Sequence, residues 1–333
     1  MTALPVPHKP ARAAAHSINV PRLIQIARED PEATRTELIA GLTAPRAELA
    51  PKYLYDALGS RLFAAITALP EYYPTRTEAA IFRAHLGEIA AAVGPASALV
   101  DLGAGNCEKA ARLFDALAVR RYVAVDISAD FLKESLDRLQ YQHPDMEMLG
   151  IGLDFSQALT LPVEVGPGPR TLFYPGSSIG NFTPAEALDF LRRVHDACEG
   201  GALLIGVDLV KPVSVLEPAY DDALQVTAAF NRNLLLHLNR LIGSDFDIAD
   251  WRHVAFFNAA ASRIEMHLEA VRDAMVCWPG GERRFPAGER IHTENSCKWR
   301  VDDFTALLRD AGFSDTRVWR DEQDWFAVFA AHA

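Results

Sequence analysis

The sequence predicts an α/β protein in which a largely parallel sheet carries a second domain of helices and antiparallel strands. Between residues 98 and 208, apolar runs typical of buried strands alternate with helical segments, the pattern of repeated β-α-β units. After Lys211-Pro212 this alternation stops, and a long helical stretch is followed by strand-like segments. With 333 residues, 50% of them hydrophobic, the chain is long enough for two domains with sizeable cores.

Charge and cysteine content exclude several classes of function. A formal net charge of −11 disfavours nucleic acid as a partner, because phosphate binding needs a basic surface. The four cysteines are scattered without a C-x-x-C pair, which argues against a zinc site and fits reduced thiols. No apolar run is long enough to span a bilayer, and residues 1–19 are predicted to be a flexible, polar, proline-bearing arm. We therefore expect a cytoplasmic protein with no metal and no membrane partner. A monomer is expected as well, although none of these observations bears on oligomeric state.

Two helical stretches are predicted in the N-terminal third. Residues 20–42 alternate charged and apolar side chains at helical spacing, and the stretch from Pro45 to Pro51 interrupts them. Thr77 is the expected N-cap of a helix over residues 78–92. Between these helices, tyrosines stand beside Pro, Gly, Asp and Arg, which favours aromatic rings that present a polar tip to a cleft rather than purely core rings.

The remaining elements follow from hydrophobic pattern and turn residues. In the parallel sheet we expect strands at 98–101, 122–126, 146–151, 170–174 and 202–208, with helices at about 108–118, 129–142 and 184–197. In the second domain we expect helix over most of 213–241, strands at 253–258, 263–270 and about 290–298, and a turn at 279–281. A helix over 301–311, ended by Gly312, precedes a strand hairpin at 315–319 and 325–331 that returns to the sheet.

A nucleoside site is predicted at the first strand of the parallel sheet. Asp101 ends an apolar run and is followed by Gly103-x-Gly105, and Asp126 ends the next strand roughly 20 residues later, where an acid can bind ribose hydroxyls. The third glycine of the dinucleotide fingerprint is missing, which favours a nucleoside without a pyrophosphate, such as S-adenosylmethionine. Each feature alone also fits a structural role, the glycines as a turn and Asp126 as a strand-end or capping residue.

Together these motifs resemble one family, the histidine Nα-methyltransferases of ergothioneine biosynthesis. The resemblance covers about residues 53 to 326. It rests on YLYDALGSRLF (53–63), LPEYYPTRTE (69–78), LGAGNCEK (102–109), PGSSIGNFTP (175–184), GVDLVK (206–211), AYDDA (219–223), VTAAFNRNLL (226–235), SRIEMHL (262–268) and TENSCKW (293–299). The chain departs from the family's usual glycine turn at Asp101, Asn106 and Cys107.

The resemblance implies a Rossmann-like class I methyltransferase sheet over 77–212 and 298–333, with a substrate-binding domain over 20–76 and 213–297. It implies S-adenosyl-L-methionine as methyl donor and L-histidine as substrate, trimethylated on its α-amine to hercynine. The matching cofactor positions are Gly103, Lys109, Asp126, Asp154 and Phe155. The matching substrate positions are Phe63, Tyr72, Asn181, Tyr220, Met266, Glu294 and Ser296, with Tyr55 and Asn181 acting on the amine.

The residue types fit this chemistry. An amide such as Asn181 can accept a hydrogen bond from the amine, and tyrosine hydroxyls can donate to a carboxylate. Glu294 and Ser296 lie two residues apart, so in a strand they share one face and could bind the two nitrogens of an imidazole. The structural alternatives are buried tyrosines with satisfied hydroxyls, a solvated strand face at Glu294, and a core-filling Met266.

Three other functions stay open from the sequence. The substrate could be another aromatic amino acid such as tryptophan, although a carboxylate gains at most one hydrogen bond from an indole. The chain could instead be a nucleoside-sensing protein without catalysis. A nicotinamide-dependent dehydrogenase is disfavoured by the missing third glycine.

Overall fold

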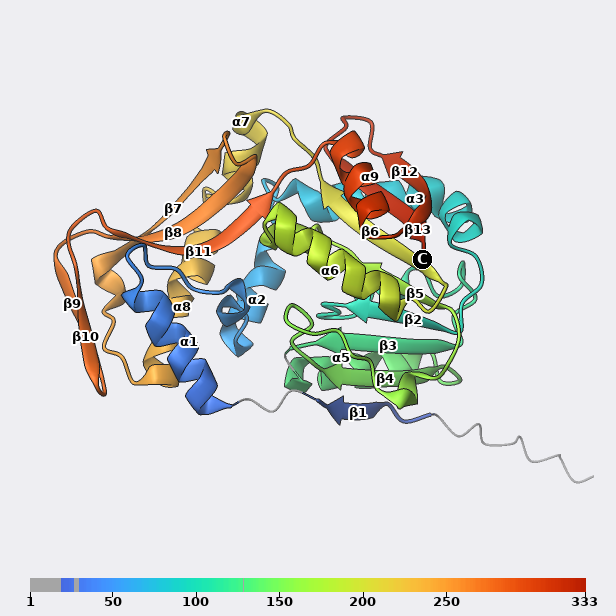
Figure 1. Cartoon of the computed structure of the whole chain (residues 1–333), viewed down its shortest axis with the longest axis horizontal. Coiled ribbons are helices and arrows are strands. Elements are labelled where there is room, and N and C mark those ends of the chain that lie inside the picture. The colour runs from blue at the N-terminus through green and yellow to red at the C-terminus, as the bar shows by residue number, and fades with distance from the viewer. Residues whose placement is uncertain (1–18, 27–29, 128) are drawn as a thin grey trace, which may run out of the picture.

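The computed structural model describes residues 19–26, 30–127 and 129–333, and a large mixed sheet dominates it (Figure 1). Within these residues the sheet has eight strands in the order β1-β4-β3-β2-β5-β6-β13-β12. The strands are β1 (Arg22–Gln25), β2 (Ala98–Leu102), β3 (Arg121–Asp126), β4 (Glu147–Gly152), β5 (Arg170–Tyr174), β6 (Ala202–Asp208), β12 (Ser314–Arg320) and β13 (Phe326–His332). Strands β4-β3-β2-β5-β6 are parallel and follow the Rossmann order, with the first strand of the alternating unit at the centre. The predicted Rossmann-like α/β class is confirmed.

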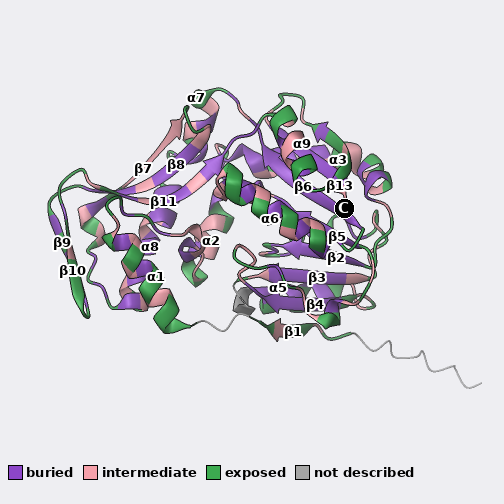
Figure 2. Cartoon of the chain, in the orientation of Figure 1, coloured by how far each residue is buried: buried purple, intermediate pink, exposed green. Residues whose placement is uncertain are grey.

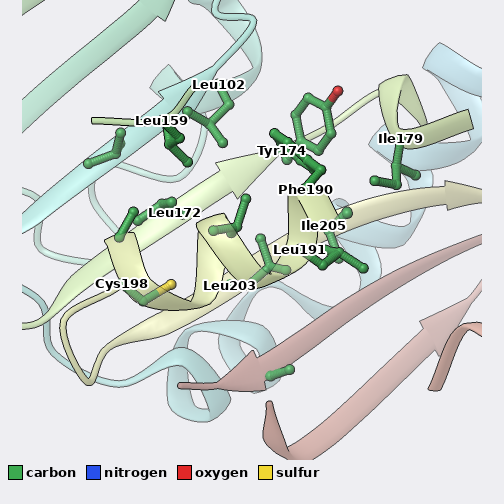
Figure 3. Close-up of a cluster of buried hydrophobic side chains, with 14 of the residues drawn as sticks. Leu102, Leu159, Leu172, Tyr174, Ile179, Phe190, Leu191, Cys198, Leu203 and Ile205 are labelled. Carbon is green, nitrogen blue, oxygen red and sulfur yellow. The ribbon is translucent and has the colours of Figure 1, made fainter. Parts of the chain in front are cut away.

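Helices cover both faces of this sheet because its strands are apolar on both sides. Helices α6 (Pro184–Ala197) and α9 (Val301–Asp310) pack on one face. Helices α3 (Tyr73–Val93), α4 (Glu108–Ala111) and α5 (Ala129–Gln142) lie on the other. Leu172 and Tyr174 of β5 belong to the same core as α6 (Figure 3), where the Tyr174 ring lies 5.1 Å from that of Phe190. Phe173 between them belongs to the opposite core. The central strands are accordingly buried along their length (Figure 2).

The second body packs helices against small antiparallel sheets (Figure 1). Its helical elements are α1 (Pro31–Thr43), η1 (Pro51–Leu54), α2 (Ala57–Ile66), α7 (Val213–Leu216), η4 (Glu217–Ala219), α8 (Val226–Ile242) and η5 (Ile248–Asp250). Its strands are β7 (Trp251–Asn258), β8 (Arg263–Ala270), β9 (Ala274–Trp278), β10 (Gly281–Phe285) and β11 (Arg290–Cys297), paired as β11-β8-β7 and β10-β9. The predicted apolar stripe of α8 is buried at Phe230, Leu234, Leu235 and Leu238, and Leu241 is partly buried.

Two short 3-10 turns complete the fold, η2 (Val163–Val165) and η3 (Ser178–Asn181). The turn η3 lies in the loop that follows β5, at the carboxyl end of the parallel strands. It packs against β11 of the second body, so this loop joins the two bodies.

Three local predictions were wrong, and one hairpin was missed. Residues 20–42 do not form one helix, because Arg22–Gln25 form a strand that pairs with β4. Helix α1 begins only at Pro31, where the side chain of the N-cap Asp30 accepts hydrogen bonds from two backbone N–H groups of the first turn. Thr77 is not an N-cap, since α3 begins at Tyr73 and the Thr77 hydroxyl donates to the Tyr73 carbonyl inside the helix. The helix expected over 108–118 ends at Ala111. The turn at 279–281 joins a hairpin, β9 and β10, whose strands were not predicted.

The predicted N-terminal arm lies almost wholly in residues 1–18, outside the described residues. The domain division stays a prediction with one change: β1 belongs to the large sheet, although residues 20–76 were expected in the substrate-binding domain. Among the described residues, no helix is both long and apolar enough to cross a membrane.

Candidate active site

A pocket opens between the loop after β5 and the second body, with about 490 Å³ of free space including its open mouth. The loop is placed at the carboxyl end of the parallel sheet, where open α/β folds bind ligands. All eight residues predicted for catalysis and substrate binding line this pocket: Tyr55, Phe63, Tyr72, Asn181, Tyr220, Met266, Glu294 and Ser296. They come from both bodies, so the structure brings together positions that span most of the chain.

One wall of the pocket is aromatic. Tyr55 lies edge-on to Phe63 and to Phe230, with ring centroids 5.5 and 5.4 Å apart. Tyr72 contacts Phe63 at 6.2 Å and Tyr220 at 6.3 Å. Burial, reinforced by nearby acidic groups, raises the pKa of the Tyr55 and Tyr72 hydroxyls well above the usual value. Both therefore remain neutral hydroxyls, able to donate and accept hydrogen bonds.

The opposite wall is formed by β8 and β11. Glu294 and Met266 are direct partners across these strands, and both line the pocket with Ser296, as the two-residue spacing of Glu294 and Ser296 predicted. The Asn181 amide donates to the Glu294 carboxylate at 3.4 Å. Burial raises the pKa of Glu294 to about 7, although Lys298 and Asn181 oppose this shift.

Behind Tyr220 and Ser296 lies a buried set of polar groups that we call the floor cluster: Tyr73, Asp208, Lys211 and Lys298. Lys298 Nζ lies 2.8 Å from Asp208 Oδ2, and Lys211 binds the other oxygen of Asp208. The Tyr73 hydroxyl donates to Asp208 Oδ2 at 2.7 Å. Asp208 and Lys211 lie in the motif GVDLVK, and Lys298 lies in TENSCKW. No role was predicted for these charges from the sequence.

The loop and α8 supply further lining residues that were missed. Ser177 and Ser178 lie in the motif that gave Asn181, and Thr227 and Phe230 lie in the motif over residues 226–235. The signal that could have found them was the motif itself, because neighbours in a loop or on one helix face reach the same space.

The predicted cofactor positions gather at the carboxyl ends of β2, β3 and β4. Gly103 and Gly105 have φ of 71° and 52°, a left-handed backbone that favours glycine. The Gly105 N–H donates to Asp126 Oδ2 at 2.9 Å, so the glycine turn and the second acid form one unit. A Cβ added at Gly103 would stand 3.7 Å from Phe155 Cζ. This bare backbone, faced by an aromatic ring and a carboxylate, fits an adenine nucleoside.

Lys109 and Asp154 are held by other charges. Lys109 Nζ lies 2.8 Å from Glu78 Oε2, and the other oxygen of Glu78 accepts the Gly176 N–H at 2.7 Å. Asp154 Oδ2 lies 3.4 Å from Lys52 Nζ. Glu78 was not predicted as a site residue, although it ends the quoted motif at 69–78. Glu78 therefore connects Lys109, one of the predicted cofactor positions, with the loop after β5 that lines the pocket.

Asp101 precedes the glycine turn and is fully enclosed. It accepts a hydrogen bond from the Tyr122 hydroxyl at 2.8 Å, and burial raises its pKa to about 7. Over the described ranges, no group of three or more His, Cys, Asp or Glu side chains could hold a metal ion.

Comparison with known proteins gives consistent matches over most of the chain. A family described as "Histidine-specific methyltransferase, SAM-dependent" matches residues 34–333. A "Histidine N-alpha-methyltransferase" from Mycolicibacterium smegmatis is 43% identical over 307 residues, covering 90% of this chain and 95% of the relative. "N-methyltransferase imqF" from Aspergillus flavus is 31% identical, covering 86% of this chain and 81% of the relative. "Ergothioneine biosynthesis protein 1" from Neurospora crassa is 30% identical over 85% of this chain but only 33% of its own length.

Proposed function

Because the chain belongs to the family of histidine-specific, S-adenosylmethionine-dependent methyltransferases, we propose that it trimethylates the α-amine of L-histidine to hercynine, a step of ergothioneine biosynthesis. The observation that supports this most is the pocket itself. It places an amide, three tyrosine hydroxyls, a carboxylate and a serine around one space. These are partners for an amine, a carboxylate and an imidazole, the three polar parts of histidine.

We assign the site residues as follows. Glu294 and Ser296 bind the imidazole. Met266 and Phe63 limit the space available to the ring. Tyr72 and Tyr220 donate hydrogen bonds to the carboxylate. The Asn181 carbonyl oxygen and Tyr55 orient the amine so that its lone pair faces the cofactor edge. The nucleoside part of the cofactor is held by Gly103, Asp126, Asp154 and Phe155. Lys109, oriented by Glu78, lies beside these positions and contributes to the same site.

S-adenosylmethionine, when bound, supplies a methyl group on a positively charged sulfur. The contribution of the chain is to hold a neutral amine in line and close, which can lower a barrier by roughly 7–11 kcal/mol. The aromatic wall adds a second effect. Each transfer leaves a bulkier cation, which must release a proton before the next transfer, and rings such as Tyr55, Phe63 and Phe230 attract such cations. This supports retention of the partly methylated substrate until the third transfer.

Mass spectrometry of the products tests the proposal. The enzyme is incubated with S-adenosylmethionine and each standard amino acid in turn, and samples are taken over time. We expect L-histidine alone to be converted efficiently, with the trimethylated form as the final product. A reaction that stops at one or two methyl groups, or that prefers tryptophan, would contradict it. The predicted monomeric state and cytoplasmic location are separate proposals, tested by light scattering and by cell fractionation.

A further inference from the structure

In the floor cluster, Lys298 is buried behind the hydroxyl groups of two pocket residues, Tyr220 and Ser296. Lys298 is fully buried, and its ammonium group has three hydrogens to donate. Its three acceptors are Asp208 Oδ2 at 2.8 Å, Tyr220 Oη at 2.9 Å and Ser296 Oγ at 2.6 Å. Every hydrogen of Lys298 is therefore used, and the ion pair with Asp208 keeps the group charged.

The position of the two hydroxyl protons follows from this arrangement. Tyr220 Oη and Ser296 Oγ lie 2.6 Å apart, and either can donate to the other. Lys298 can only donate, so it accepts neither proton. One proton spans the two oxygens, and the second has no acceptor among the contacts of the described residues. Both side chains line the pocket, so this second proton is available to a ligand there.

The chemistry of that ligand is set by Lys298. A hydroxyl that accepts a hydrogen bond from an ammonium group becomes a stronger donor, since such chains polarise one another. Strong donors gain most from an ionised acceptor. Within histidine the α-carboxylate is the ionised acceptor, whereas the imidazole nitrogen is neutral.

We infer that Lys298 is a positioning residue that makes the Tyr220 hydroxyl, hydrogen-bonded to Ser296, a strong donor for the substrate carboxylate. This rests on the proposed function, because it assumes that histidine occupies the pocket. Lys298 does not touch the substrate. It acts through Tyr220 and Ser296, and it is held in place by Asp208.

Lys211 provides a matched control. It is also buried and also paired with Asp208, but its other contacts are the Tyr73 hydroxyl at 2.8 Å and the Leu209 carbonyl. It does not contact either pocket hydroxyl. Removing Lys211 therefore takes one charge from Asp208 and leaves the contacts of Lys298 in place.

The test compares L-histidine with histamine, which lacks only the carboxylate. Calorimetry measures both dissociation constants on enzyme saturated with S-adenosylhomocysteine, for wild type, K298M, K211M, Y220F and Y220F/K298M. We expect wild type to bind histidine more tightly than histamine. In K298M the ratio of the two dissociation constants should fall at least tenfold, because histidine binds more weakly. K211M should keep the preference within about threefold, and K298M should add little to Y220F. In kinetics, the effect should appear mainly in KM rather than in kcat.

Three outcomes overturn the inference. A folded K298M that keeps the wild-type preference, an equal loss in K211M, or an equal weakening of histamine would each show that Lys298 does not act on the carboxylate. If K298M does not fold, Y220F decides, because it removes only a hydroxyl, and an unchanged preference then rejects the inference. Failure of the proposed function is distinguishable, since wild type would then not trimethylate histidine at all.

Discussion

The pocket changes the pKa of one of its own residues, Glu294. Its carboxylate is buried, with Asn181 as its hydrogen-bond donor, and burial raises its pKa to about 7. A carboxyl group that holds its proton to this pH can donate to a bare imidazole nitrogen, whereas the ionised group can only accept an imidazole N–H. Burying such a group also affects the stability of the folded chain, because the unfolded chain releases the same proton at lower pH.

The first prediction concerns this linkage. The pKa of Glu294 is raised from 4.5 to about 7 on folding, so between these values the folded state binds a proton that the unfolded state has released. Stability from this group therefore falls as pH rises through that window, by roughly 1.4 kcal/mol per pH unit. E294Q cannot ionise, so it should gain stability relative to wild type between pH 5 and pH 8.

Urea unfolding at both pH values measures this difference. E322Q, at an exposed glutamate, controls for the loss of a carboxylate from the surface. If the difference between E294Q and wild type is the same at pH 5 and pH 8, the Glu294 carboxyl does not carry the shifted proton.

At the scale of elements, the central strands were predictable and the edge strands were not. Strands such as β5 and β6 are buried on both faces, and a continuous apolar run in the sequence predicts such a strand. Strand β1 is mostly exposed and exists because it pairs with β4, a partner more than 100 residues away. Strand β10 carries charged side chains and, among the described strands, pairs with β9 alone. Their structure comes from tertiary pairing, which local pattern does not contain.

The second prediction tests how β6 supports the site. A Cβ at Gly206 would lie 2.1 Å from Glu78 Oε1 and 3.0 Å from Phe326 Cε1, so G206A should displace the Glu78 carboxylate. Glu78 would then lose its contacts with Lys109 and the Gly176 N–H. We expect a loss of about 1–3 kcal/mol in the free energy of unfolding and weaker binding of S-adenosylhomocysteine by calorimetry.

Gly87 offers the matched control. It lies in α3, and a Cβ there meets nothing within 4 Å. G87A should therefore stabilise the chain by up to about 1 kcal/mol, because alanine favours the helix. Equal stabilities for G206A and wild type would show that Glu78 can move without cost.

At the scale of the whole molecule, the sequence could predict which residues share the pocket but not what lies behind them. The eight predicted pocket residues belong to motifs recognisable along the chain. Lys298 and Asp208, and Glu78 and the Gly176 N–H, are pairs between distant segments, the latter 98 positions apart. A buried charge is tolerated only with its partner, and that partner appears only when the two segments meet in the fold.

The third prediction concerns the ion pair that joins the two bodies. Lys52, in η1, lies 2.9 Å from Glu37 and 3.4 Å from Asp154, and its side chain is 19% exposed. Tyr55 of the pocket follows η1 by one residue. The same lysine therefore ties the segment that carries Tyr55 to the carboxyl end of β4, where the cofactor positions gather.

Reversing the charge of Lys52 should weaken ligand binding at both the cofactor positions and the substrate pocket. K52E places a third carboxylate beside Glu37 and Asp154, and losing a pair of this kind costs about 1 kcal/mol, or roughly fivefold in a dissociation constant. We expect calorimetry to show weaker binding of both S-adenosylhomocysteine and histidine. K133E breaks an exposed pair within α5, Lys133 with Asp137, and should leave both constants unchanged. If K52E binds both ligands as wild type does, the loop after β5 and its contact with β11 hold the two bodies together without this ion pair.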